Sequence, residues 1–220
     1  MEHIAYIRSD FPDKFGIPRQ SGLVDSLVSR VVFAPEYRNP DALRGIEGFS
    51  HLWLIWEFSE SVGKPWSPTV RPPRLGGNAR LGVFATRSPF RPNPIGLSCV
   101  RLVAVEQGKE GPVLVVAGAD LMDGTPIYDI KPYIPYADCQ FDALGGFTTN
   151  ASDYLLKVEF PETELVKLPT DRRQTAMDLL SHDPRPSYQK DPQRVYGMSF
   201  AGKNIRFRVE EDTLIVLEVL

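Results

Sequence analysis

The sequence predicts a mainly β protein, with a β-barrel main domain over residues 1–150 and a small α+β domain over residues 151–220. Short apolar segments alternate with turns rich in Gly and Pro, and the 20 prolines among 220 residues are about twice the ordinary share of ~5%. The first 150 residues contain hardly any strong amphipathic helical pattern, whereas a clear one follows after residue 150. Many short strands separated by such turns are typical of barrels and sandwiches.

The main domain is expected to consist of short strands joined by loops. Because proline fixes φ and has no backbone N–H, residues 11–20 and 61–77, which are rich in Pro and Gly, are expected to be loops. Residues 39–45 are predicted to form one short helical turn that ends at Gly45. The expected strands are residues 3–8, 23–33, 51–58, 81–85, 97–106 and 112–117.

The region after residue 150 is expected to form one helix and several strands. Residues 171–182 contain the clearest helical pattern of the chain, and Pro184 and Pro186 end it. The expected strands are residues 153–160, 195–200, 203–209 and 213–220. This change of pattern places the domain boundary near residue 150.

The stretch from Ala79 to Ser98 reads ARLGVFATRSPFRPNPIGLS and places two arginines, Arg87 and Arg91, among three prolines. A residue that precedes proline is disfavoured in the α region, so this stretch is expected to be extended and stiff. Arginines on a stiff loop lose little conformational entropy on binding, which suits an anionic or planar ligand. The alternative is a proline-rich connection whose arginines are merely solvated.

Positive charge is concentrated around this stretch. Residues 61–105 contain seven Lys or Arg and no Asp or Glu, although the whole chain has a net charge of −3. A basic region within an acidic protein favours a localised anion site over a uniformly cationic surface. The seven cations are Lys64, Arg71, Arg74, Arg80, Arg87, Arg91 and Arg101.

Four further segments combine polar groups with turn-forming residues. They are Pro18-Arg19-Gln20, His51-Leu52, residues 120–126 (DLMDGTP) and residues 129–138 (DIKPYIPYAD). The first three have structural alternatives: a solvated turn, a satisfied histidine at a strand end, and a hairpin turn at the Asp-Gly pair. The fourth places carboxylates, a lysine and two tyrosines around prolines, so it also resembles a site loop.

Several classes of site are excluded because their motifs are missing. The sequence contains no Gly-x-Gly-x-x-Gly after a strand, no Walker phosphate loop and no Gly-x-Ser-x-Gly. Its three histidines are widely spaced, and Cys99 and Cys139 lack metal or redox spacing, so we expect no metal site. No apolar run approaches the ~18 residues of a membrane span, and the first residues lack signal-peptide character. We therefore expect a cytoplasmic protein with reduced thiols and no membrane contact.

Four motifs that occur in a fixed order resemble those of one family: PRQ at 18–20, TRSPFRPNPIGLS at 86–98, DLMDGTP at 120–126 and DIKPYIPYAD at 129–138. Together they closely resemble the TsaA-like family of S-adenosylmethionine-dependent tRNA N6-methyltransferases. The resemblance covers residues 1 to about 140 strongly, and it extends more weakly through DPRPSY at 183–188 and YGMSF at 196–200. The long arginine/proline run is highly specific, whereas PRQ alone carries no weight.

The resemblance implies a homodimer whose main domain binds S-adenosylmethionine without a Rossmann fold. It also implies methylation of N6 of threonylcarbamoyladenosine, next to the anticodon, so the expected partner is the tRNA anticodon stem-loop. By carry-over, the cofactor pocket includes Pro18, Arg19, Gln20, His51, Leu52, Arg87, Leu97, Asp120, Leu121, Met122 and Asp123. Something must take the N6 proton during or after methylation. The candidates are Asp129, Tyr133, Tyr136 and Asp138, with water as the alternative.

An RNA substrate requires a basic surface, which residues 61–105 supply. A second basic group lies in the tail, so we expect the C-terminal domain to contact the tRNA, the alternative being a solvated face. This group comprises Arg185, Lys190, Arg194, Lys203, Arg206 and Arg208. Two other functions stay open: an S-adenosylmethionine-binding sensor without transferase activity, and a methyltransferase of the same fold that acts on another substrate.

Overall fold

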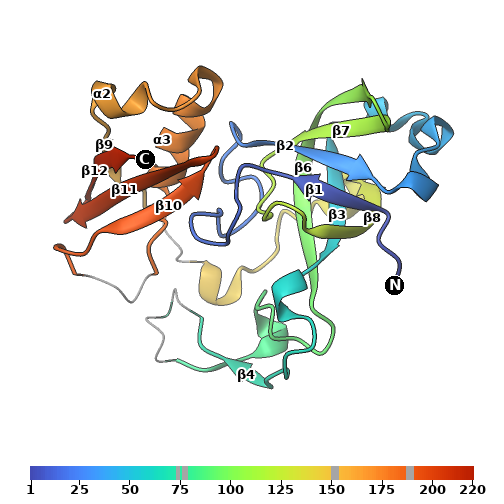
Figure 1. Cartoon of the computed structure of the whole chain (residues 1–220). Helices are drawn as coiled ribbons and strands as arrows, with labels where there is room; N and C mark the ends of the chain where they lie inside the picture. Colours follow the sequence, from blue (N-terminus) through green and yellow to red (C-terminus); the bar gives the residue numbers. More distant parts are fainter. Residues whose placement is uncertain (73–74, 76–78, 150–153, 187–190) are drawn as a thin grey trace.

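Two sheets dominate the structure, a computed structural model that describes residues 1–72, 75, 79–149, 154–186 and 191–220. The larger sheet is built from the N-terminal part of the chain and the smaller from the C-terminal part, and they lie side by side in Figure 1. A short strand pair lies apart from both of them, at the bottom of the same view. The prediction of a mainly β protein is confirmed.

The larger sheet is a closed barrel with the strand order β1-β2-β7-β6-β3-β8, in which β8 pairs with β1. Side chains on β3 alternate, so Leu52, Leu54 and Trp56 point into the barrel core while the residues between them face outward. The strands are β1 (Ala5–Arg8), β2 (Val28–Phe33), β3 (His51–Glu57), β6 (Ile95–Gly108), β7 (Gly111–Ala117) and β8 (Pro126–Pro132).

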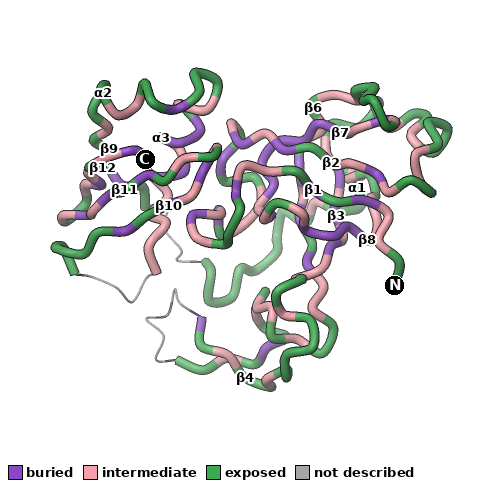
Figure 2. The backbone as a smooth tube through the Cα atoms, viewed as in Figure 1, coloured by how far each residue is buried: buried purple, intermediate pink, exposed green. Residues whose placement is uncertain are grey.

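Between β3 and β6 the chain leaves the barrel in a segment that we call the lobe, residues 61–94, of which the structure describes 61–72, 75 and 79–94. The strands β4 (Thr69–Val70) and β5 (Leu81–Gly82) pair antiparallel within it. The described part of this lobe is largely exposed (Figure 2). Its many prolines remove backbone donors, which explains why the strand pair stays so short.

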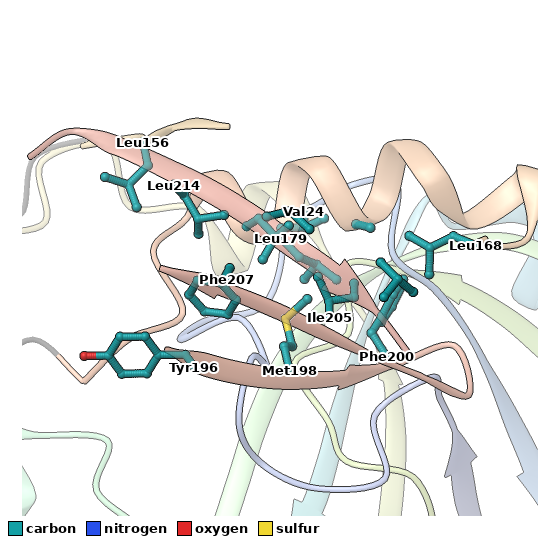
Figure 3. Packing of buried hydrophobic residues seen from close by; sticks show 14 of the residues in the cluster. Val24, Leu156, Leu168, Leu179, Tyr196, Met198, Phe200, Ile205, Phe207 and Leu214 are labelled. Carbon is teal, nitrogen blue, oxygen red and sulfur yellow. The ribbon is translucent and has the colours of Figure 1, made fainter. Parts of the chain in front are cut away.

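The smaller sheet has the order β10-β11-β12-β9, and β9 runs parallel to β12. Helix α3 covers one face, and the side chains between helix and sheet form a separate hydrophobic core (Figure 3). Phe11, Val24 and Leu27 belong to this core although they come from the N-terminal part of the chain. The elements are β9 (Lys157–Glu159), α2 (Glu162–Leu165), α3 (Arg173–Ser181), β10 (Tyr196–Phe200), β11 (Lys203–Glu210) and β12 (Thr213–Val219).

Short helical turns complete the fold. The turn expected at residues 39–45 is a 3-10 helix over Pro40–Leu43, and the side chain of Asn39 caps it by accepting a hydrogen bond from the Asp41 N–H. The one short α-helix of the barrel part is α1 (Pro135–Asp138), among the described residues. Further 3-10 turns are Pro35–Tyr37, Ile46–Gly48, Ser59–Ser61, Val83–Ala85, Gly146–Thr148 and Thr170–Arg172.

Several expected elements differ from the structure. The strand expected at 153–160 is limited, in its described part, to Lys157–Glu159. The strand expected at 23–33 begins only at Val28, because Val24 and Leu27 are apolar for packing in the second core and not for strand pairing. The strand expected at 81–85 ends at Gly82 and continues as a 3-10 turn. Residues 129–138, expected as a loop, include the end of β8 and all of α1, since pairing of residues 129–132 with β3 supplies hydrogen bonds that no local pattern reveals.

In the part of the chain that the structure describes, no helix has both the length and the apolar character needed to cross a membrane.

Candidate functional site

A cavity of about 650 Å³ opens at one end of the barrel, beside the lobe. Its wall is built from four separate parts of the chain, which lie within residues 14–20, 56–64, 86–97 and 120–125. Three of these parts contain the PRQ, TRSPFRPNPIGLS and DLMDGTP motifs. Segments that are far apart in the sequence therefore meet at one concave site of a size suited to a small-molecule ligand.

Strand pairing explains why these segments meet. Glu57, at the end of β3, pairs with Ile95, at the start of β6, so the two ends of the lobe return to the same place. The turn between β7 and β8 reaches the N-terminal loop, since the Asp123 N–H donates to the Phe11 carbonyl at 2.8 Å. The Ser9 hydroxyl donates to the Leu121 carbonyl at 2.9 Å and fixes the same turn.

A hydrogen-bonded chain links the barrel core to the cavity. The indole Nε1 of Trp56 donates to the Ser98 hydroxyl at 2.9 Å, and that hydroxyl donates to Oδ1 of Asp120 at 2.5 Å. Burial raises the pKa of the Asp120 carboxyl, although the Ser98 hydrogen bond and the Arg87 charge act in the opposite direction. Asp120 is thus a carboxylate held in one orientation at the cavity wall, which suits it to bind hydroxyl or ammonium donors.

Arginines at the cavity are anchored by neutral oxygens. Arg87 donates through Nη1 to the amide oxygen of Gln20, which joins two of the motif segments. Arg19 donates through Nη2 to the backbone carbonyl of Arg185 at 2.9 Å and to that of Asp183 at 3.4 Å. The PRQ loop therefore contacts both the arginine/proline run and the C-terminal part of the chain.

The arginine/proline run is held by its own side chains. Arg91 donates through Nη1 to the carbonyls of Thr86 at 2.7 Å and Val83 at 3.2 Å. The Thr86 hydroxyl donates to the Val83 carbonyl at 2.8 Å and accepts from the Ser88 N–H at 3.3 Å. These contacts, together with the prolines, support the predicted stiffness of the run.

A second carboxylate of the wall, Glu57, lies in a different setting. It accepts a short hydrogen bond from the hydroxyl of Tyr128, and its Oε1 lies 3.6 Å from Nε2 of His3. Burial and the adjacent Glu57 carboxylate raise the pKa of Tyr128 to about 12, so this phenol keeps its proton and donates at neutral pH. Glu57 is thereby fixed at the cavity edge.

Most residues expected in the cofactor pocket line this cavity, but three do not. Leu52 is fully buried in the barrel core, and His51 lies at the far end of β3 with its Nδ1 2.9 Å from the Ser50 hydroxyl. The Asp123 carboxylate accepts from the Ser9 N–H at 3.0 Å and stabilises the turn. The residues that line the cavity are Pro18, Arg19, Gln20, Arg87, Leu97, Asp120, Leu121 and Met122.

None of the four candidate proton acceptors lines the cavity. Two of them, Tyr133 and Asp138, lie in a cluster at the end of β3 that is away from the cavity. The Tyr133 ring packs against the rings of His51 and Trp53, with ring centroids 6.2 and 5.8 Å apart. Asp138 accepts from the Trp53 indole at 3.1 Å. The remaining two lie on the surface, where Asp129 pairs with Lys131 at 2.8 Å and Tyr136 is 90% exposed.

The cavity and this cluster share one outward face of the sheet. Leu97 lines the cavity and pairs with Ile55 in the β3–β6 ladder. The next pair on the same face, Trp53 with Cys99, lies two residues further along each strand. His51 lies four residues from Ile55, or about 13 Å along the strand at ~3.3 Å per residue. Within one chain, the cavity and the cluster around Tyr133 therefore lie next to each other on the same outward face.

Some cavity residues were not predicted from the sequence. Trp56, Glu57 and Phe58 end the aromatic strand and form one wall, and Gly96 lies beneath the Trp56 ring. The signal available for them was the polar Glu57 at the end of an apolar strand and a glycine at the start of the next one. Only the pairing of β3 with β6 shows that these positions are adjacent.

The donor set of the cavity defines the ligands that it suits. Arg87 can bind a carboxylate or phosphate, Asp120 can accept from hydroxyl or ammonium groups, and Leu97, Leu121 and Ile95 offer apolar surface. A nucleoside that carries both an acidic and a cationic group fits this combination.

Comparison with protein families agrees with these features. Residues 6–139 match the model described as the tRNA-methyltransferase O N-terminal domain, and residues 153–220 match the TrmO C-terminal domain.

Known proteins resemble the chain over nearly its full length. It is 44% identical to the tRNA (adenine(37)-N6)-methyltransferase of Escherichia coli K12, over 96% of this chain and 93% of that protein. It is 46% identical to the protein of the same name from Eikenella corrodens, over 78% of this chain and 97% of that protein. The crystal structure of TrmO from Pseudomonas aeruginosa superposes with a TM-score of 0.77 at 34% identity, covering 99% of this chain and 97% of that one.

Proposed function

The chain belongs to the tRNA-methyltransferase O family, and on this basis we propose that it transfers the methyl group of S-adenosylmethionine to N6 of adenine 37 in tRNA. The observation that carries the proposal is the convergence of three motif segments on one cavity whose polar groups suit this cofactor. The sensor without transferase activity and the methyltransferase with another substrate are the competing functions that the experiment below separates.

The cavity offers a partner for each part of S-adenosylmethionine. We assign the cofactor carboxylate to Arg87, which Gln20 orients, because a guanidinium binds carboxylates through two parallel hydrogen bonds. Asp120 is placed to accept from the ribose hydroxyls or the ammonium group. Leu97 and Leu121 supply apolar surface around the nucleoside. When bound, the cofactor supplies an electrophilic methyl carbon.

The contribution of the protein is alignment and the exclusion of water. The stiff run that contains Arg87 and Arg91 fixes the site before binding, so less entropy is lost when the reactants meet. Positive charge on sulfur disperses during methyl transfer, and an apolar wall therefore favours the transition state over the hydrated ground state.

We propose that the enzyme works as a homodimer formed through the outward face of β3 and β6. Leu97 on this face is 52% exposed although it is apolar, and Trp53 and Cys99 follow it along the same ladder. A second copy laid on this face covers that apolar surface and lies beside the cavity. In such a dimer His51, on the outward face, comes close to the cavity of the second copy, whereas Leu52 stays buried in the barrel core of its own chain.

The same dimer accounts for the candidate proton acceptors. Asp129, Tyr133, Tyr136 and Asp138 lie outside the cavity of their own chain. We propose that one of the four, supplied by the second copy, takes the N6 proton as the new bond to carbon forms, with water as the alternative acceptor.

The substrate is proposed to be the tRNA anticodon stem-loop in which adenine 37 carries the threonylcarbamoyl group. A base in a single-stranded loop is extruded at lower cost than a base in a duplex, so a cavity at the protein surface is sufficient. We further propose that residues 1–150 bind the cofactor and that residues 151–220 contact the tRNA. The bonds from Arg19 to the backbone of Asp183 and Arg185 support this division, because they place the C-terminal part at the cavity edge.

Methyl transfer to defined tRNAs tests the function. Purified protein is incubated with methyl-labelled S-adenosylmethionine and tRNA with or without the threonylcarbamoyl group, and nucleosides are then analysed by mass spectrometry. We expect label on N6 of adenine 37 only in the modified tRNA. Cofactor binding without labelled RNA contradicts the transferase proposal, and equal labelling of both tRNAs contradicts the role of the threonylcarbamoyl group.

A further inference from the structure

We propose that the described part of the lobe, residues 61–72, 75 and 79–94, is the principal surface that binds the anticodon loop, by stacking exposed aromatic rings on unpaired bases and by placing cations without acidic partners against phosphates. This inference rests on the proposed function and identifies where its RNA substrate binds. It assigns the main RNA contact to a segment between two barrel strands and leaves a lesser contact to the C-terminal part of the chain.

Exposed aromatic side chains mark the lobe. Phe84 is 73% exposed, Trp66 49% and Phe90 46%. Exposure of three large rings within one short segment costs solvation free energy that a folded protein ordinarily avoids. Aromatic rings on a basic surface are the usual platform for single-stranded nucleic acid, because every base has a face that can stack.

The cations of the lobe lack acidic partners. Among the described residues, Lys64, Arg71, Arg80, Arg87 and Arg91 form no ion pair with a carboxylate. Arg87 and Arg91 donate to neutral oxygens, and the Arg91 guanidinium lies 5.7 Å from the centre of the Phe84 ring. Arg87 lies near Asp120 and is assigned to the cofactor carboxylate, whereas the positive charge of the other four cations is available to an external anion such as a phosphate. Arg74, the remaining cation of the lobe, lies outside the described residues.

Three tail arginines already pair with carboxylates, whereas Arg194 and Lys203 form no ion pair with a carboxylate among the described residues. Arg206 pairs with Glu218 at 2.6 Å, Arg208 with Glu210 at 2.9 Å, and Arg185 with Asp183 at 2.8 Å. A phosphate that approaches these arginines must displace a carboxylate and then meets its negative charge. Lys190, expected as part of the same basic group, lies outside the described residues. Contact of RNA with Arg185, Arg206 and Arg208 is thus expected to be weaker per cation than contact with the lobe.

The internal bonds of the lobe keep rings and cations in fixed positions. The Ser67 N–H donates to the Phe90 carbonyl at 3.3 Å, and the Val83 N–H donates to the Pro68 carbonyl at 3.0 Å. These bonds link the segments before and after the β4–β5 pair and so hold Trp66 near Phe90. A platform that is already ordered pays little conformational entropy when RNA binds.

The lobe is also continuous with the cavity. Lys64, Phe90 and Arg91 line the cavity wall, whereas Trp66, Arg71, Arg80 and Phe84 do not. A base that enters the cavity therefore leaves its neighbouring nucleotides over the lobe. Binding of the anticodon loop to the lobe therefore positions the target base at the cavity.

Binding of a labelled anticodon stem-loop, measured by fluorescence anisotropy over a series of salt concentrations, tests the inference. Arg71→Ala/Arg80→Ala is expected to weaken binding and to reduce the salt slope by about 1.4, since each phosphate contact on a single strand contributes about 0.7. Phe84→Ala is expected to weaken binding at least about fivefold with an unchanged slope, because a stacked base is lost and no charge is removed. None of these three positions lines the cavity, so cofactor affinity measured by calorimetry should not change.

Matched variants provide the controls. Arg206→Ala/Arg208→Ala removes two arginines that already pair with carboxylates, and Phe49→Ala removes an aromatic side chain that is 40% exposed on the barrel part. Both should bind the stem-loop within about twofold of the wild type, given the small effect expected of neutralised charges.

The outcomes separate this inference from the proposed function. Suppose that the wild-type protein methylates tRNA, that the lobe variants bind RNA normally and that the Arg206/Arg208 variant does not. This result shows that the lobe is not the principal RNA-binding surface, and it leaves the proposed function intact. Wild-type protein that binds cofactor but neither binds nor methylates tRNA overturns both.

Discussion

The indole ring of Trp56 lies directly over Gly96, so closely that a Cβ atom at position 96 would stand 2.3 Å from Cε2 of the ring. The two residues belong to adjacent strands and are paired in the β3–β6 ladder. The same ring donates a hydrogen bond to Ser98, which in turn holds Asp120 at the cavity. A glycine at position 96 is therefore a condition for the position of the cavity carboxylate.

Gly96→Ala should destabilise the protein and weaken cofactor binding together. The added methyl group forces the buried Trp56 ring to move, and overpacking of this kind costs about 1–3 kcal/mol of unfolding free energy. Urea denaturation measures the loss, and calorimetry measures the affinity. Gly48→Ala is the control, because a Cβ there meets no atom within 4 Å. Wild-type stability of the Gly96 variant would show that the ring can move freely.

Asp120→Asn should stabilise the fold at neutral pH while it weakens cofactor binding. Burial raises the pKa of Asp120 in the folded protein above the unfolded value of about 3.9. The protonated carboxyl therefore contributes stability that is fully present below the unfolded pKa and is lost as the pH rises through the raised pKa of the folded protein. At neutral pH the ionised, buried carboxylate thus lowers the stability of the fold. Asparagine removes the charge but can still accept from Ser98. Thermal unfolding should show a higher midpoint at pH 7 and no advantage below pH ~4. A lower midpoint at pH 7 would contradict the prediction.

Leu97→Glu should dissociate the proposed homodimer. The variant places a charge on an apolar side chain that is 52% exposed, and burying that charge between two copies is unfavourable. Sedimentation velocity should show monomers for this variant and dimers for the wild type. Leu217→Glu, which changes a leucine that is 40% exposed on β12, should remain dimeric. A monomeric wild type would rule out the dimer.

Mixed dimers should recover activity if two copies build each site. Arg87→Ala and Asp138→Asn are each expected to be impaired alone. A random mixture should reach about a quarter of the wild-type rate, since half of the dimers are mixed and each of these has one intact site. A mixture of Arg87→Ala with Asp120→Asn should not recover, because both residues line the cavity of the same chain. Recovery in neither mixture would mean that Asp138 acts within its own chain.

Local sequence patterns were sufficient for several parts of this protein. The aromatic and apolar residues 51–58 predicted a strand, and the structure confirms it over His51–Glu57. The helical pattern of residues 171–182 is confirmed by α3 together with the 3-10 turn before it. The prolines of residues 86–94 predicted an extended run with ordered arginines. Each of these features depends on backbone sterics or on the burial period of one segment, which are local properties.

Other features were decided only by tertiary contacts. Val24 and Leu27 appeared to extend a strand, but they pack in the core of the C-terminal sheet. Residues 129–138 appeared to be a loop, yet β8 exists because β1 and β3 offer it hydrogen-bonding partners. The sequence by itself determined which residues carry charge, stiffness and apolar surface. Only the folded barrel decided that Arg87, Gln20 and Asp120 meet at one cavity while His51 and Asp138 lie elsewhere, because distance in space is set by strand pairing between segments far apart in the chain.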